Sequence, residues 1–408
     1  MNSPIRIGVR GLCVATLAIG MASATAQPVT LAHAVEAAWQ RAAESAATQG
    51  ALRRAQAETA TAFARWAAPP SLEVAQRMDR GLSGTGARET EVGVAAPLWL
   101  PGQRSARQQV VAADIDVARA QAAMARWQVA GTVRATQSEI LWRAAELAQV
   151  QREAQALQAL SRDVQRRVGA GELASADALA ADAEWLQAQG RVAQTADQLA
   201  QLRLQWRTLT GLDEVPPLDA SPGTGSEDQE ALDAHPALRE ARARVEAAER
   251  KIDLAGASRR SAPEVVARLR QDVGGRGVAA VNSWGAALRI PFGTDDRNEP
   301  LQAAALSARE LAQAQLRQLQ QQLAATVEAQ RLTQSALDRQ WASEQQRAAL
   351  LRERATLIGK SFQAGETALP DMLRALAAAH AAEAAVQRLR IQRAQAAARL
   401  QHALGILP

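Results

Sequence analysis

The sequence predicts a mainly α-helical fold with a small β part, in which one chain builds the same long-helix bundle twice. Three observations predict it: an alanine-rich composition, an internal repeat, and two very long segments with helical periodicity. Alanine makes up about a quarter of the 408 residues, and aromatic residues only 3%, with nine Trp, three Phe and no Tyr. So few large side chains cannot fill a deep globular core, whereas alanine-rich helices can pack closely along their length.

The first 26 residues have the pattern of a secretory signal peptide. Arg6 and Arg10 precede a short apolar run, and Ala24-Thr25-Ala26 supplies small residues for cleavage. A membrane anchor would need about 20 apolar residues, more than this run contains. Cleavage after Ala26 would remove Cys13, the sole cysteine. The mature chain would then have neither a disulfide nor a cysteine-ligated metal.

The strongest feature is a repeat at a spacing of 194 residues. The segment Gly171–Leu179 resembles Gly365–Leu373, with matching Gly-Glu, Asp and Leu positions. The same shift relates further landmarks: Pro69 to Pro263, Pro97-Leu98 to Pro291-Phe292, and Gly211-Leu212 to Gly405-Ile406. This period is far too long for a short solenoid repeat. We therefore expect a first repeat over residues 27–212, a linker over 213–231 and a second repeat over 232–408.

Each repeat contains a long segment that predicts a helix, over residues 103–168 and 297–362. About 66 residues at 1.5 Å each make a rod of roughly 100 Å, which is typical of coiled-coil assemblies. Apolar residues recur at alternating spacings of four and three, which indicates left-handed supercoiling. Shorter helices are expected in two pairs, 30–67 with 176–210 and 232–261 with 370–405. Each pair, placed end to end, matches one long helix in length.

Two segments in each repeat alternate apolar and polar residues: about 71–79 and 90–99, then about 264–273 and 281–292. This pattern is typical of transmembrane β-barrel strands, with a soluble hairpin as the alternative. Trp99, Trp284 and Phe292 are candidate aromatics at the membrane interface. Four strands cannot close a barrel, so membrane insertion would require several copies. Three copies would give a twelve-stranded barrel.

The long helices end at glycine-containing turns, over residues 168–179 and 362–373. Ser175 and Thr367 are candidate N-caps for the helices that follow. Asp177 and Asp371 fall in the first turn of those helices, where the helix dipole favours a carboxylate. That structural role carries as much weight as a functional one.

The sequence resembles the TolC-type outer-membrane factor family. Three features together carry this resemblance: the duplicated order of elements, the Gly-x5-Asp-x-Leu turns, and the glycines that close each half. The segment Pro97–Arg104 is similar to the family's element before its long helix, and its form is most like the heavy-metal (cobalt–zinc–cadmium) efflux branch. The resemblance covers the mature chain. It implies a homotrimer with a β-barrel in outer-membrane lipid of a Gram-negative bacterium and a helical tunnel in the periplasm. It also implies docking onto a periplasmic adaptor protein and an inner-membrane RND-type pump.

The resemblance places adaptor-docking or gating positions in the two turns, at the tunnel tip. They are Arg166, Arg167, Gly171, Asp177, Leu179, Gly365, Asp371, Leu373 and Arg374. Three copies of a carboxylate near the pore axis would form a cation-binding ring. The sequence departs from some family members at two positions. Arg374 stands where a second acidic residue can occur and Thr367 where a gating arginine can occur, so a salt-bridged gate is not expected.

Other classes of protein are less well supported. The four histidines are scattered, and no phosphate loop, nucleophile elbow or HExxH motif occurs. We therefore expect no catalytic residues, no cofactor and no metal site. A formal charge of +5 over 408 residues gives no reason to expect a nucleic-acid partner. Within the resemblance, export of drugs or type I protein secretion remain alternatives to heavy-metal efflux. Outside it, the alternative is an exported soluble coiled-coil structural or adaptor protein.

Overall fold

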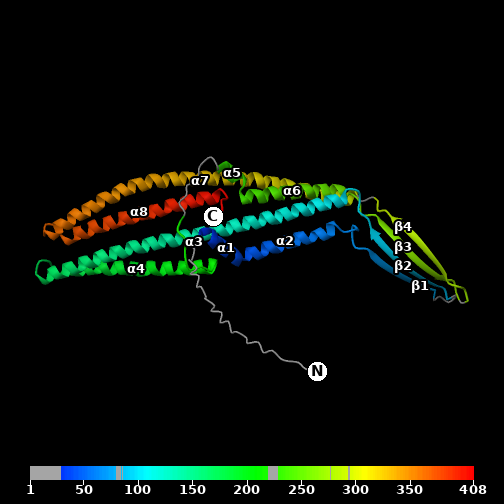
Figure 1. Cartoon of the computed structure of the whole chain (residues 1–408), viewed down its shortest axis with the longest axis horizontal. Coiled ribbons are helices and arrows are strands. Elements are labelled where there is room, and N and C mark those ends of the chain that lie inside the picture. The colour runs from blue at the N-terminus through cyan, green and yellow to red at the C-terminus, as the bar shows by residue number, and fades with distance from the viewer. Residues whose placement is uncertain (1–28, 80–83, 85, 219–227, 276, 293–294) are drawn as a thin grey trace, which may run out of the picture.

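The chain forms an elongated array of helices with a β-sheet at one end (Figure 1). This description rests on a computed structural model, which describes residues 29–79, 84, 86–218, 228–275, 277–292 and 295–408. The expected signal peptide and much of the linker, residues 219–227, lie outside the described residues. Within the part that is described, no helix combines the length and apolar character needed to cross a membrane.

Two helices of exceptional length form the frame. They are α3, Gln103–Gly169, with 67 residues, and α7, Asp295–Gln363, with 69 residues. At 1.5 Å per residue each is roughly 100 Å long. The shorter helices are α1 (Leu31–Arg41), α2 (Ala43–Ala62), α4 (Ser175–Thr210), α5 (Asp228–Asp233), α6 (Pro236–Ala257) and α8 (Leu369–Ala403).

The shorter helices lie along the long ones in a single curved layer. Helices α2 and α4 follow one another along α3, while α6 and α8 follow one another along α7 (Figure 1). The two halves meet where α3 packs on α6 and, less extensively, on α8. Many contact positions are alanines, among them Ala130, Ala181, Ala188, Ala348 and Ala382. Small side chains let the helix axes approach closely, so a thin layer can form without a deep core.

The helices expected over 30–67 and 232–261 are both interrupted. Ala42 is extended, with ψ 135°, and separates α1 from α2. Helix α6 begins at Pro236 because proline fits the first turn of a helix, and His235 Nδ1 caps it by accepting from Ala237 N–H at 3.1 Å. The prediction of one continuous helix in each case was wrong. The break at Ala42 arises from tertiary packing, since nothing in the local sequence stops the helix there.

The sheet is antiparallel, with the order β1-β2-β3-β4. Its strands are β1 (Ser71–Met78), β2 (Arg88–Pro97), β3 (Glu264–Val273) and β4 (Val281–Arg289). The backbone pairs β2 from the first repeat directly with β3 from the second. Leu98 N–H continues that junction by donating to Pro263 O at 2.7 Å. Strands β1 and β4 form the two edges and have no partner on their outer sides among the described residues.

The register gives the sheet one apolar and one charged face. Val74, Val92, Leu269 and Trp284 form one cross-strand row on the apolar face. On the other face Arg268 pairs with Glu91 at 3.2 Å and Arg270 with Glu89 at 3.0 Å. The apolar face is largely exposed in the single chain. A sheet of this kind needs an apolar surrounding on one side and tolerates water on the other.

Candidate functional site

The two helical turns at the end opposite the sheet have the same backbone geometry. Gly171 and Gly365 have φ values of +81° and +80°, in the left-handed region that favours glycine. Glu172 N–H donates to Arg167 O at 2.9 Å, and Glu366 N–H donates to Ser361 O at 3.0 Å. Each long helix therefore ends in the same Schellman-type turn, and the two sets of hydrogen bonds are 194 residues apart.

The helices after the turns are capped differently from expectation. The N-cap residues are Ala174 and Ala368, so the predicted caps Ser175 and Thr367 were wrong. Asp177 supplies only the reciprocal half of a capping box, because its Oδ2 accepts from Ala174 N–H at 3.2 Å. Thr367 Oγ1 instead lies 2.6 Å from Ser361 Oγ. Asp371 forms an ion pair with Arg374 one turn later. The carboxylates of both turns are thus already engaged within the chain.

Arg167 ties the two turns together. Its Nη1 donates to Phe362 O at 3.1 Å, its Nε pairs with Glu172 at 2.9 Å, and its guanidinium lies over the Phe362 ring at 5.0 Å. Below this contact Val164, Ala181, Phe362 and Leu369 form a small buried cluster. The sequence analysis predicted a role for Arg167 but did not predict this cluster. The available signal was Phe362, which is the last residue of the predicted long helix over 297–362, where apolar residues follow the heptad spacing. The turns form one packed tip rather than two separate hairpins.

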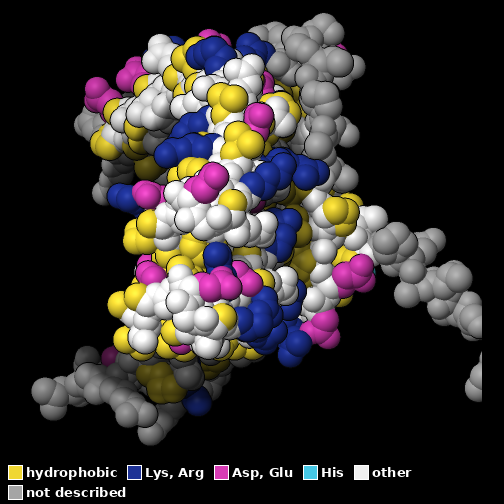
Figure 2. Space-filling view, turned by 90° about the vertical axis from the view of Figure 1, so that its left-hand side faces the viewer, with side chains coloured by type: hydrophobic (Ala, Val, Ile, Leu, Met, Phe, Trp, Pro, Cys, Tyr) yellow, Lys and Arg dark blue, Asp and Glu magenta, His cyan; other side chains and the backbone are white. Residues whose placement is uncertain are grey.

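The remaining predicted residues of the tip divide into exposed and packed positions. Arg166 is exposed and pairs with Asp163 of its own helix, at 2.8 Å. Leu373 packs against the tip cluster, whereas Leu179, its equivalent in the first repeat, is 72% exposed. All nine predicted residues lie at this end of the molecule. Figure 2 views this end and shows basic side chains gathered along one side of the layer.

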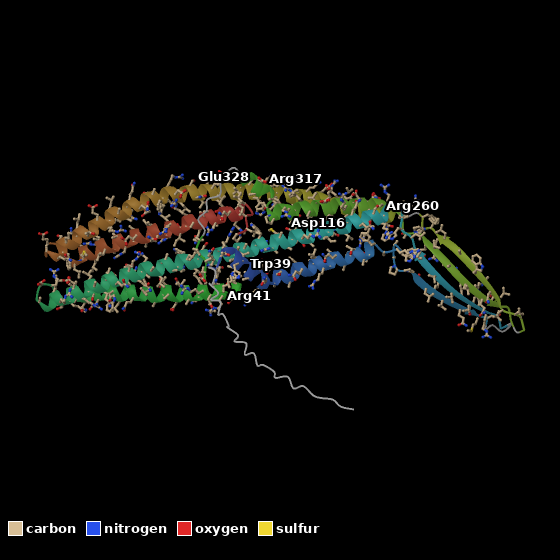
Figure 3. All side chains as sticks on the ribbon, viewed as in Figure 1. Trp39, Arg41, Asp116, Arg260, Arg317 and Glu328 are labelled. Carbon is tan, nitrogen blue, oxygen red and sulfur yellow. The ribbon has the colours of Figure 1, made fainter. Side chains whose placement is uncertain are left out.

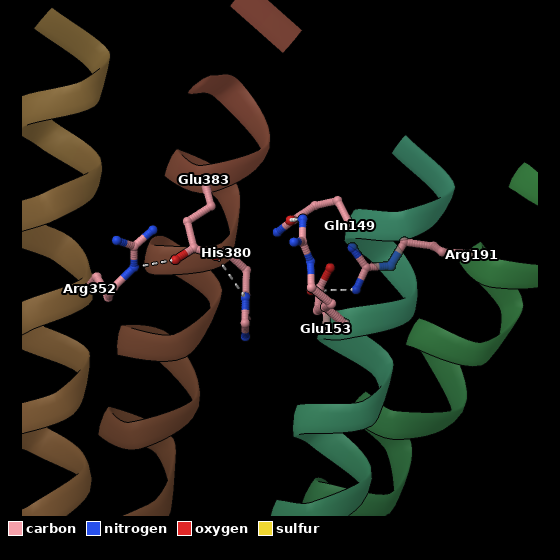
Figure 4. Close-up of polar contacts among 7 residues, drawn as sticks. Gln149, Glu153, Arg191, Arg352, His380 and Glu383 are labelled. Carbon is pink, nitrogen blue, oxygen red and sulfur yellow. Dashed lines mark hydrogen bonds and ion pairs between the residues drawn. The ribbon is translucent and has the colours of Figure 1, made fainter. Parts of the chain in front are cut away.

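A polar groove separates the two hairpins above the tip. It has a volume of 560 Å³ and is lined by residues of α3, α4 and α8. Glu153 pairs with Arg191 at 2.7 Å on one side, and Glu383 pairs with Arg352 at 2.6 Å on the other (Figure 4). His380 lies on the α8 side of this gap. Each of these two ion pairs joins the two helices of one hairpin, so neither of them connects the two hairpins. No periodic pattern in the sequence predicts this groove.

A buried cluster of two histidines and a tryptophan lies halfway along the molecule, where the two repeats meet. His402 stacks on Trp127 with ring centroids 4.2 Å apart, and His235 meets the same ring edge-on at 4.8 Å. Trp127 Nε1 donates to His402 O at 3.0 Å. Burial, together with the positive charge of Arg134 and the neighbouring His235, lowers the pKa of His402 to about 4. The cluster therefore holds its imidazoles neutral and joins α3, α6 and α8.

The nearby glycines that close each repeat are in tight surroundings. Gly405 lies against His235 and Pro236, and Gly211 lies against the Arg41 guanidinium. Trp39 and Arg41 lie near the middle of the array, far from Arg260 at the junction with the sheet (Figure 3). These contacts hold the C-terminal end of α4 against α1 and the C-terminal end of α8 against the start of α6.

The predicted interface aromatics occupy two environments. Trp284, on β4, is 84% exposed and Phe292, just beyond that strand, is 90% exposed. Trp99 lies between β2 and α3, where its Nε1 donates to Ala64 O at 3.1 Å. Trp99 therefore anchors the junction of helix and sheet.

Across the residues described here, no three His, Cys, Asp or Glu side chains gather in a group that could hold a metal ion.

Comparison with known proteins identifies the fold. Residues 229–406 match the family model described as outer membrane efflux protein. Comparison with curated protein sequences finds no match.

Solved structures match over almost the whole chain. The outer membrane protein VceC of Vibrio cholerae superposes with a TM-score of 0.75 at 17% identity, covering 92% of this chain and 96% of that one. CusC, whose structures concern transmembrane channel formation, gives 0.72 at 18% identity and covers 92% of each chain. The open state of the Neisseria gonorrhoeae MtrE outer membrane channel gives 0.67 at 18% identity, over 92% of this chain and 89% of that one. The chain thus has the fold of these outer-membrane channel proteins, with a helical array and a four-stranded sheet.

Proposed function

We propose that the protein is an outer-membrane efflux protein that forms a trimeric channel, the exit duct of a tripartite efflux pump, and that it is not an enzyme. The observation that carries this proposal is the open sheet. Its charged residues pair with each other on one face, while apolar side chains such as Leu72, Val74 and Leu269 stay exposed on the other. Lipid outside and water inside would satisfy both faces at once.

Assembly of several copies would remove the unpaired edges. Unpaired strand edges are not tolerated in the hydrocarbon region, so β4 of one copy must pair with β1 of the next. Three copies of this sheet would form a twelve-stranded barrel, within the known range for outer-membrane barrels. The same rotation would place α7 beside α2 and α4 of the neighbour and close the helices into a tunnel. A soluble coiled-coil protein would leave the apolar sheet face uncovered.

The tip would dock onto a periplasmic adaptor, and an inner-membrane RND-type pump would supply the transport energy. The exposed positions Arg166, Leu179 and Asp371, with Arg374 and the half-buried Asp177, would face that partner or the pore. Gly171 and Gly365 set the shape of the docking turns, and Arg167 with Leu373 holds them together. Because Asp371 pairs with Arg374 and Asp177 accepts from Ala174 N–H, a cation-binding ring would form only if these carboxylates turned toward the axis.

Heavy-metal cations are the cargo that we propose, on the strength of the Pro97–Arg104 segment. Drug export and type I protein secretion are the competing cargoes. A deletion strain tests them: sensitivity to zinc, cobalt or cadmium should rise and return to normal on complementation. Unchanged metal tolerance together with new drug sensitivity would contradict the metal assignment and leave the channel assignment intact.

A further inference from the structure

A buried arginine without a counter-charge lies halfway along the molecule, on helix α3. Arg134 is only 6% exposed, and its Nη1 has no hydrogen-bond partner among the described residues. No carboxylate in the described part of the chain forms an ion pair with it. A guanidinium stays protonated in proteins, so the chain cannot remove this charge by releasing a proton. Because an unpaired buried charge is costly, a group of negative charge is expected beside Arg134.

The two histidines of the buried cluster lie against the same stretch of α3. Nε2 of His402 lies 2.6 Å from the position that a Cβ at Gly131 would occupy, which places this imidazole directly on the helix backbone. Arg134 follows Gly131 by three residues and therefore lies on the same face, about one turn nearer to the tip. His235, the N-cap of α6, meets the Trp127 ring edge-on at 4.8 Å. The three side chains thus come from α3, α6 and α8 and gather where the two repeats meet.

These side chains present hydrogen-bond donors and no charged acceptor. Nδ1 of His235 accepts from Ala237 N–H at 3.1 Å, so the neutral imidazole carries its proton on Nε2. That Nε2 is buried without a partner among the described residues, and so is Nδ1 of His402. A neutral His402 can hold its proton on Nδ1 and donate as well. A guanidinium and two imidazole N–H groups together suit an acceptor of negative charge.

The pKa values of these groups agree with their surroundings. Burial lowers the pKa of Arg134 and that of His235. Burial, followed by the charge of Arg134 and the neighbouring His235, lowers the pKa of His402 to about 4. The charge of Arg134 therefore acts on His402 at short range, which supports the proximity of the three groups.

Burial limits the size of the group that can pair with Arg134. His235 is 0% exposed and Arg134 is packed inside one chain, so a side chain of another protein cannot reach either of them. His402 is only half-buried, and a small ion can reach the cluster beside its ring. A water molecule could accept the hydrogen bonds but would leave the charge of Arg134 uncompensated.

We infer that Arg134, His235 and His402 bind a small inorganic anion of the size of chloride at the junction of the repeats. This site goes beyond the proposed channel and does not depend on it, because all of its groups belong to one chain. The bound ion neutralises Arg134 and links α3 of the first repeat to α6 and α8 of the second.

Bromide locates the ion directly, because it can replace chloride and scatters X-rays anomalously. Crystals of the purified full chain grown in sodium bromide should show an anomalous peak within hydrogen-bonding distance of Arg134 and His235. Absence of that peak would overturn the proposal. A water molecule or a side-chain carboxylate in the same position would overturn it as well.

Thermal unfolding tests the same site in solution. Sodium chloride is compared with sodium gluconate at equal ionic strength, because gluconate is too large for the site but screens surface charges equally. The unfolding temperature should be higher in chloride. Once chloride exceeds its dissociation constant, each tenfold increase should raise this temperature by about 2–4 °C.

Replacement of the arginine connects the chloride effect to the site. Arg134→Met keeps the length of the side chain without its charge, so this variant should unfold at the same temperature in both salts. The control is Arg162→Met, which removes an exposed arginine from the same helix and should respond to chloride like wild type. If Arg134→Met fails to fold, Arg134→Lys serves instead. It retains the charge but loses the planar fork, and should need about tenfold more chloride for the same rise.

Each combination of results decides for or against the ion. A bromide peak together with a chloride effect that Arg134→Met loses supports the site. An equal chloride effect in wild type and Arg134→Met would be general stabilisation by salt and would overturn it. A bromide peak without a chloride effect in solution would mean an adventitious ion only, which also overturns the proposal.

Discussion

At the scale of single residues, glycine conformation determines the shape of the tip. Gly365 has φ +80°, and a Cβ added there would meet no atom within 4 Å. The cost of replacing it is therefore backbone strain and not a steric clash. For a residue other than glycine that strain is about 1–2 kcal/mol. The same holds for Gly171, at φ +81°.

We predict that Gly171→Ile and Gly365→Ile reshape the turns, leave the oligomer intact and abolish export. The control is Gly169→Ala, because Gly169 lies in helix α3, with ordinary helical φ, and has open space around it. Oligomer mass and export should be measured for each variant. Normal export by both isoleucine variants would show that the tip is not the docking site.

The buried histidine cluster predicts a pH dependence of stability. The pKa of His402 is about 4 in the folded chain, against an ordinary value of about 6.5 when unfolded. Between these values the unfolded chain binds the proton more readily, so stability falls as pH drops from about 6.5 to 4. This pKa difference corresponds to about 3 kcal/mol of folding free energy per chain.

The measurement compares wild type with His402→Gln, since carboxylates also titrate near the lower end of this range. Thermal unfolding followed across pH 4 to 7 should show a smaller acid-induced loss in the variant. Trp127 keeps its hydrogen bond, because that bond goes to the backbone of residue 402. Parallel pH profiles would mean that His402 is protonated equally in both states.

At the scale of elements, two neighbouring arginines of α3 have different roles. Arg167 links the two hairpins, and Arg166 is a surface charge. Arg167 contacts Phe362 of the other hairpin, whereas Arg166 pairs with Asp163 on its own helix. We predict that Arg167→Ala loosens the tip and speeds amide hydrogen exchange in residues 360–373. Arg166→Ala is the control and should exchange like wild type. Equal rates in all three proteins would contradict the tether.

The two faces of the sheet should respond differently to added charge. Leu269→Lys places a cation on the apolar face, which costs about 2–4 kcal/mol at the centre of a bilayer. Ala75→Lys adds the same charge on the face that carries Glu91 and Arg270. We predict loss of membrane assembly for the first variant alone, measured by fractionation. Equal amounts of both variants in the membrane fraction would contradict the assignment of the faces.

Elements with strong periodic signals were the most predictable part of the fold. The long helices follow from heptads that contain no proline apart from Pro300 near the start of α7. The strands follow from alternation that the sheet register reproduces. The break at Ala42 and the caps at Ala174 and Ala368 were not predictable. Tertiary packing sets the first, and neither Ala174 nor Ala368 makes a side-chain cap hydrogen bond. The groove between the hairpins and the His402 cluster depend on contacts across hundreds of residues.

At the scale of the whole molecule, the chain is an open layer with complementary edges. Strand β4 and helix α7 form one edge, and β1 with α2 and α4 forms the other (Figure 1). Nothing in the described chain covers the apolar face of the sheet. In the proposed channel these edges would meet the edges of other copies, and the oligomer would be the functional unit.

The mass and location of the native protein test this account most directly. Membranes should be fractionated, the protein extracted in detergent, and the molar mass of its protein component determined. We expect an outer-membrane protein with three times the mass of the mature chain. A periplasmic monomer that needs no detergent would contradict the channel and leave a helical protein with an exposed apolar sheet.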